Sequence, residues 1–175
     1  MGKLLLTLIV IAAAVIGGGY FNRTQCLSDE GPRAAVLGYV TAMKDKRFGD
    51  AYPFVTATMT DGKPVAEWAG LQRKMFEMGG VAIGEIDVRS PHRELKNMFM
   101  CVATAKVPNV LHAGDVLNNQ GSTEFEIYNV VLEGGAWKID SQETLFDEPM
   151  IHRWFPNDKI PDLKGTADQP ATEKK

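Results

Sequence analysis

Carboxylate and hydroxyl side chains are the groups of this sequence best suited to chemistry. Glu85 and Asp87 lie two residues apart in a predicted strand, so they share one face of it, and either could act as a base toward a carbon-bound proton. Tyr39, Tyr52 and Tyr128 could supply a hydroxyl that stabilises an oxyanion. No spacing joins such a base to a hydroxyl, and charged residues at strand ends are usually solvated. We therefore expect a non-catalytic domain and keep proton-transfer catalysis as the alternative.

No metal or cofactor motif accompanies these groups. The sequence has no glycine-rich phosphate loop, no Gly-x-Ser-x-Gly turn and no Cys-x-x-Cys pair. The three histidines, His92, His112 and His152, are far apart and lack the spacing of metal ligands. We therefore expect no metal and no cofactor. The net charge of −3 with scattered basic residues also argues against nucleic acid as a partner.

The spacing of apolar residues predicts three helices followed by four antiparallel strands. The helices are expected to begin after Ser28 or Asp29, at about Phe48 and after Pro64, with Gly79 and Gly80 ending the third. The expected strands are residues 81–89, 95–107, 123–132 and 137–146. This order is typical of an α+β fold in which the helices cover one face of a curved, cone-like sheet. Trp137 shares a strand face with Ile139, so we expect it in the core.

Residues 4–21 form an uncharged run between Lys3 and Arg23. At about 1.5 Å per residue such a helix reaches roughly 27 Å, close to the ~30 Å hydrocarbon core. We therefore predict a retained transmembrane helix within an anchor of residues 1–23, and a signal peptide cleaved before Tyr20 is the alternative. The short basic N-terminus favours the N-terminus inside and the soluble domain outside the cytoplasm, in a periplasm-like space. Small residues four apart would let another helix approach closely; they are Ala13, Ala14, Gly17 and Gly18.

The rest of the chain has the length of one domain, residues 24–163, followed by a polar tail. Residues 164–175 are too polar to bury, so we expect them to be disordered. Cys26 and Cys101 would be compatible with one disulfide in an oxidising compartment. A buried free thiol is the default for Cys101, which sits in an apolar run, and the spacing does not decide between the two.

Two stretches resemble the nuclear transport factor 2-like superfamily. Residues 36–52, a long helix with a polar end followed by a small-aromatic helix, look like its opening helix pair. Residues 134–141, Gly-Gly-Ala-Trp-Lys-Ile-Asp-Ser, are similar to its closing hairpin. The resemblance covers roughly residues 30–147 and implies a cystatin-like α+β cone. The superfamily includes ketosteroid isomerase-like enzymes, polyketide cyclases and non-catalytic modules, among them membrane-anchored assembly factors of type IV secretion systems, so the fold alone does not transfer a function.

Apolar residues also occur where the predicted core does not need them. Leu111, Val116 and Leu117 lie in a long loop, residues 108–122, and Trp154 and Phe155 lie in an arm beyond the last strand. Such side chains favour partner docking, although the arm could instead fold back over the open sheet face.

Together these features predict a membrane-anchored, non-catalytic interaction module. It would be an accessory or assembly subunit that binds other membrane or envelope proteins, and the lipid bilayer through residues 4–21. The alternative is a small apolar-ligand binder or a ketosteroid isomerase-like enzyme that uses the cone interior. A filled cone would favour the module, and a deep cavity in which a carboxylate and a hydroxyl converge would favour the alternative.

Overall fold

The computed structural model describes residues 2–97, 100–117 and 121–160, with the side chains of all of these except 2–8, 22, 25–27 and 100. The tail predicted to be disordered, residues 164–175, lies outside the described residues. The helices are α1 (Gly2–Leu27), α2 (Gly31–Lys44), α3 (Phe48–Ala51), a 3-10 turn (Tyr52–Phe54), α4 (Ala57–Thr60), α5 (Val65–Gly79) and α6 (Glu148–Trp154). The strands are β1 (Ala82–Val88), β2 (His92–Asn97), β3 (Met100–Gly114), β4 (Ser122–Glu133) and β5 (Ala136–Leu145). The fold is α+β, as predicted, but the sheet has five strands rather than four.

The additional strand arises because the segment predicted as one strand, 95–107, is a hairpin. Strand β2 pairs with the first half of β3, and β1 pairs with its second half, so β1 and β2 follow each other along one edge of β3. Strands β4 and β5 complete an antiparallel sheet that is not closed. Pro108 was expected to end a strand but lies inside β3, where its carbonyl accepts a hydrogen bond of 2.9 Å from the Arg89 N–H. The chain passes from β1 to β2 next to Pro108. The N–H that proline lacks is therefore at the place where the hydrogen-bond ladder along this edge of β3 is interrupted.

The end of α5 follows the sequence prediction. Gly80 adopts a left-handed conformation with φ +59°, and its N–H bonds back to the last turn of the helix. Glycine reaches this conformation without strain, so the double glycine ends the helix and starts β1.

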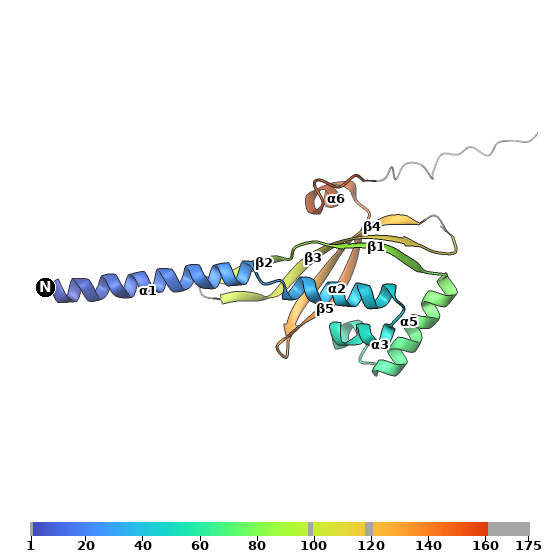
Figure 1. The fold of residues 1–175 in the computed structure, drawn as a ribbon, viewed down its shortest axis with the longest axis horizontal. Helices are drawn as coiled ribbons and strands as arrows, with labels where there is room; N and C mark the ends of the chain where they lie inside the picture. Colours follow the sequence, from blue (N-terminus) through green and yellow to red (C-terminus); the bar gives the residue numbers. More distant parts are fainter. Residues whose placement is uncertain (1, 98–99, 118–120, 161–175) are drawn as a thin grey trace, which may run out of the picture.

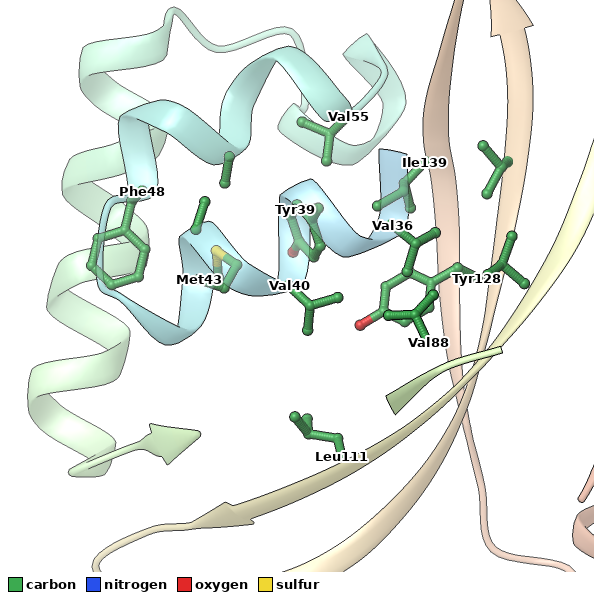
Figure 2. Packing of buried hydrophobic residues seen from close by; sticks show 14 of the residues in the cluster. Val36, Tyr39, Val40, Met43, Phe48, Val55, Val88, Leu111, Tyr128 and Ile139 are labelled. Atoms are coloured by element: carbon green, nitrogen blue, oxygen red, sulfur yellow. The ribbon is translucent and has the colours of Figure 1, made fainter. Parts of the chain in front are cut away.

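The main core lies between α2 and the concave face of the sheet (Figure 2). Val36, Tyr39 and Val40 of α2 pack against side chains that all four long strands contribute, including Val107, Tyr128 and Ile139. Trp137 is only partly buried and packs against the edge of this core, so the prediction of a core residue holds in part. It is half-buried at the rim, where the Arg93 guanidinium lies 4.7 Å from its ring centre. Its place directly after the β4–β5 turn leaves one side of the ring to this cation instead of to the core.

A second core covers the outer face of the sheet. Helix α6 follows β5 and folds back over this face (Figure 1), where Ile151 and Phe155 pack against Phe125, Ile127 and Leu145. The Phe125 and Phe155 ring centres are 5.0 Å apart. Strand β4 is therefore covered on both faces, by α2 on one side and α6 on the other.

Helix α1 leaves the domain at one end of the cone and projects away from it, whereas α5 lies at the opposite end (Figure 1). Its large apolar side chains from Ile9 to Phe21 are exposed. Across the part of the chain that the structure describes, no helix is long and apolar enough to cross a membrane. Cys101 is disulfide-bonded and no described cysteine is free, so the default expectation of a free thiol is wrong; the other cysteine of the chain is Cys26.

The outer core generates a stability prediction with a matched control. Phe155→Ala should lower the free energy of unfolding by about 3–5 kcal/mol, because Phe155 is only 1% exposed and its removal leaves a cavity between α6 and the sheet. Phe146→Ala removes the same atoms from a ring that is 80% exposed and should change the stability by less than about 0.5 kcal/mol. Urea unfolding followed by circular dichroism measures both. Equal effects of the two variants would show that α6 does not pack as described.

Candidate functional site

A cavity of about 330 Å³ lies inside the cone, toward the end where α5 and the start of β1 are found. Its walls come from α2, α5, β1 and the concave face of β3, β4 and β5. Apolar side chains form one part of the lining, and they are Val40, Met43, Phe76, Val81, Ile83, Leu111 and Ala113. Polar side chains form the other part, and they are Tyr39, Gln72, Asp115, Ser122, Glu124, Glu126, Tyr128 and Gln142.

The polar part is organised around Glu126, whose side chain is only 2% exposed. Its Oε2 accepts hydrogen bonds from the Asn109 amide at 2.8 Å and from the Tyr128 hydroxyl at 2.9 Å. Its Oε1 accepts a short hydrogen bond from the Gln142 amide. Three neutral donors from three adjacent strands therefore hold one carboxylate at the floor of the cavity, as a buried carboxylate requires.

This arrangement carries a cost that an apolar floor would not. Among the described residues, the Asn109 Oδ1 is buried without a hydrogen-bond partner, although the same amide donates to Glu126 through Nδ2. An unsatisfied buried acceptor typically costs about 1–3 kcal/mol. The hydrogen bond to Glu126 therefore sets the orientation of the Asn109 amide and leaves its Oδ1 without a partner among the described residues.

Two further polar groups in the cavity lack a hydrogen-bond donor or acceptor in the described part of the chain. The Tyr39 side chain is 7% exposed, and no partner of its hydroxyl is found there, although its ring packs edge-on to Tyr128 with centres 6.1 Å apart. Glu124 lies two residues before Glu126 on the same strand face, and its half-buried carboxylate also has no donor there. The hydroxyls of Tyr39 and Tyr128 are seen between α2 and the sheet in Figure 2. The cavity therefore contains hydrogen-bonding capacity that the protein itself leaves unused.

Burial and like charge shift the titration of these groups in the same direction. Burial raises the pKa of Glu126, its three hydrogen bonds oppose this shift, and the charge of Glu124 adds to it. Burial, followed by the neighbouring charge of Asp115, raises the pKa of Glu124. Burial and the Glu126 charge raise the pKa of Tyr39 to about 12, and the same two causes raise the pKa of Tyr128 well above its ordinary value. Perturbed groups that share one cavity are typical of binding and catalytic sites.

The structure rejects the predicted bases. Glu85 and Asp87 are exposed, and neither lines the cavity. A register shift in β1 between Ile83 and Ile86 turns the isoleucines toward the core and the carboxylates toward solvent. Of the predicted hydroxyls, Tyr39 and Tyr128 do line the cavity, whereas the Tyr52 hydroxyl donates to the Lys63 carbonyl at 2.7 Å.

Sequence reasoning missed Glu126, the centre of the site. Glu124, Glu126 and Tyr128 alternate with Phe125 and Ile127, and this alternation is typical of a strand with one solvated face. The aromatic residues after β5, Trp154 and Phe155, are the sequence feature from which the site could have been predicted. If an arm covers the apolar face of β4, then the polar face must turn inward.

The residues predicted to bind a partner are spread over different environments. Leu111 lies in the cavity wall and Phe155 in the outer core, so both are buried by the chain itself. Trp154 is half-buried, next to the His92 ring and the Lys106 ammonium. Val116 and Leu117 are exposed beyond the end of β3, Leu117 by 94%. On α1, Ala13, Ala14, Gly17 and Gly18 are exposed, and a side chain at either glycine would meet no described atom.

Comparison with known proteins adds a likeness of fold. No protein-family model matches the sequence, and no curated protein matches it either. A ketosteroid isomerase-like protein of Erwinia carotovora atroseptica is 16% identical with a TM-score of 0.48, covering 67% of this chain and 95% of that one. A domain of unknown function with a cystatin-like fold from Nostoc punctiforme is 14% identical with a TM-score of 0.46, covering 71% and 80%. A protein of Bdellovibrio bacteriovorus is 11% identical with a TM-score of 0.43, and the match covers 63% of this chain and 38% of the length of that one.

These structural neighbours include a ketosteroid isomerase-like protein and a domain with a cystatin-like fold. No function follows from likenesses of this size, so the functional argument rests on the cavity itself.

The buried carboxylate predicts a pH dependence of stability. The pKa of Glu126 is raised in the folded state, so the folded protein binds more protons than the unfolded chain above the ordinary value of 4.5. Its contribution to stability is therefore complete below about pH 4.5 and is lost as the pH rises through the folded-state pKa.

Glu126→Gln removes this titration while keeping the shape of the side chain. The melting temperature of the wild type minus that of the variant should thus fall as the pH is raised from about 4.5 to 8. Glu143→Gln, on an exposed carboxylate of β5, is the control and should leave the difference flat. Parallel melting curves of wild type and Glu126→Gln would contradict the described burial of the carboxylate.

Proposed function

We propose that this domain binds a small, largely apolar molecule inside the cone. The observation that carries the proposal is the cavity in which Glu126 is held ready by three donors while the Tyr39 hydroxyl is unused. Its volume of about 330 Å³ is at the lower end of the usual range for ligand pockets, roughly 300–1,000 Å³.

Binding is better supported than catalysis. A general base needs a free lone pair directed at the substrate, and three donors already occupy much of the capacity of Glu126. The same bonds stabilise the charged form and partly offset the rise in the Glu126 pKa that burial causes, so Glu126 is a weaker base than burial alone would make it. A carboxylate held in this way is suited to orient a ligand, and an isomerase-like role stays the alternative.

The cavity can be tested with 1-adamantanol, a compact neutral probe. In the full-length chain, millimolar probe should cause saturable changes in the amide NMR signals of residues that line the cavity. Ile83→Trp places an indole in the cavity wall and should abolish these changes, because it fills the space that the probe needs.

The control is Leu132→Trp, which adds the same side chain at a half-exposed position of β4 outside the cavity and should leave binding intact. Absence of saturable shifts, or shifts that persist in a folded Ile83→Trp variant, would refute ligand binding in the cone.

A second proposal concerns α1, which we propose tethers the domain to a membrane with its N-terminus on the cytoplasmic side. The support is the uncharged run of residues 4–21 together with the exposure of its large apolar side chains, such as Ile11 and Ile16, on a helix that projects from the domain. These side chains find no partner surface in the part of the chain that the structure describes, and lipid would cover them.

Membrane fractionation tests the tether. The full-length chain should sediment with membranes and resist extraction by alkaline carbonate, whereas the double variant Ile11→Asp/Val15→Asp should move to the soluble fraction. Each aspartate at a helix centre costs roughly 2.5–3.5 kcal/mol of insertion energy.

Leu132→Asp/Phe146→Asp is the control, since it places the same charges on exposed positions of the domain. Release of the wild-type chain by carbonate would reject a retained tether. So would an intact mass that corresponds to a chain beginning near Tyr20.

An interaction role in a larger membrane or envelope complex rests on fewer residues than the sequence indicated. With Leu111 and Phe155 buried, the exposed side chains that remain are those of Val116 and Leu117, with Trp154 partly accessible. We keep partner binding at Val116 and Leu117 as a proposal subordinate to ligand binding.

A further inference from the structure

The charged groups in the lining of the cavity all have the same sign. Among the described lining residues, the carboxylates are Asp115, Glu124 and Glu126, and there is no lysine, arginine or histidine. Each carboxylate raises the pKa of a neighbour: Asp115 acts on Glu124, and Glu124 acts on Glu126. The cavity is thus a negatively charged space whose charges repel one another.

The hydrogen bonds in the cavity do not cancel this charge. Glu126 is held by two amides and a phenol, all of them neutral. Glu124 has no donor in the described part of the chain, whereas Asp115 is exposed and accepts, among its contacts, a hydrogen bond of 2.7 Å from the backbone N–H of Leu117. The charges that matter inside the cavity are therefore those of Glu124 and Glu126. Neutral donors satisfy the lone pairs of Glu126 but leave its charge in place, and because this carboxylate is buried, its charge attracts a cation more strongly than it would in water.

A second feature independently indicates a ligand with a polar end. The Tyr39 side chain is more than nine-tenths buried and lines the cavity, and its hydroxyl has no partner among the described residues. The other part of the lining is apolar, and it includes Val40, Met43, Phe76, Ile83 and Leu111.

We propose that the ligand of the cone is an organic cation, namely a protonated amine carried on a compact apolar body. This inference depends on the proposed ligand binding and specifies its chemistry. The ammonium lies at the acidic pole formed by Glu124, Glu126 and Tyr39, where it donates to the Glu124 carboxylate and to the phenol oxygen of Tyr39, while the buried charge of Glu126 attracts it without a further hydrogen bond. The apolar body packs against the walls of α2, α5, β1 and β3. A bare metal ion does not suit the site, because oxygen ligands surround such an ion on all sides and half of this lining is hydrocarbon.

Three probes with one apolar cage and different head groups test the proposal. They are 1-adamantylamine, which is a cation, 1-adamantanol, which is neutral, and adamantane-1-carboxylate, which is an anion. Titration calorimetry and amide NMR on the full-length chain near neutral pH should show the amine binding roughly tenfold tighter than the alcohol, with the carboxylate weakest.

A charge-removing variant locates the effect. Glu124→Gln should weaken binding of the amine by roughly five- to tenfold and leave binding of the alcohol within about twofold, because only the amine interacts with the lost charge. Glu143→Gln removes the same charge from an exposed position of β5 outside the cavity and should change neither affinity. The Glu124 side chain makes no hydrogen bond within the described residues, so the variant is expected to keep its fold, and its melting curve verifies this.

The outcomes separate this inference from the proposed function. Failure of all three probes to bind would reject ligand binding in the cone. Binding of the alcohol or the carboxylate as tightly as the amine would keep ligand binding and overturn the preference for a cation. The same conclusion would follow if Glu124→Gln weakened the amine and the alcohol equally.

Discussion

Burial of one carboxylate is the constraint on which much of this domain depends. Glu126 sits between two layers of apolar packing, and an unpaired charge in that position would be several kcal/mol too costly to keep. Donors from β3, from β4 itself and from β5 satisfy it, so the strands must hold a register that places Asn109 and Gln142 beside it. The pairs Asn109↔Glu126 and Tyr128↔Gln142 follow directly from that register. A slip of one residue in either pairing would move Asn109 or Gln142 to the other face, whereas Tyr128 would stay because it lies on the same strand as Glu126.

The register in turn depends on α6. If the outer face of β4 were open to water, Phe125 and Ile127 would be exposed, and the alternating pattern of the strand would favour turning them inward. Coverage by Ile151 and Phe155 removes that conflict and allows the polar face to form the floor of the cavity. The helix that looked like a docking arm therefore has a structural role on one side of the sheet and makes the site possible on the other.

These couplings explain which parts of the structure the sequence could predict. Features with local causes were predicted correctly: the helical spacing of Val36, Tyr39 and Val40, and the glycine stop at Gly80. The β2–β3 hairpin was missed because the connecting residues, Met98 and Phe99, carry no turn signal in the sequence. Glu126 was missed for a different reason. Whether a polar strand face meets water or a cavity is decided by elements more than twenty residues away, and no pattern within the strand records it.

The placement of the site relative to α1 links the cavity to the proposed tether. The lining residues from the end of β3, the start of β1 and the later turns of α5 lie at the end of the cone opposite α1 (Figure 1). A membrane at the level of α1 would thus leave this end of the cavity in the aqueous phase, so a ligand that enters there would arrive from solution and not from the lipid. An amine with a compact apolar body suits that route better than a long-chain lipid does, because its charge keeps it soluble and the acidic pole offsets the loss of its hydration once it enters. The exposed Val116 and Leu117 lie at the same end of the cone, where the Val116 N–H bonds to the Gly79 carbonyl. The remaining candidate docking residues are therefore next to the cavity and far from the tether.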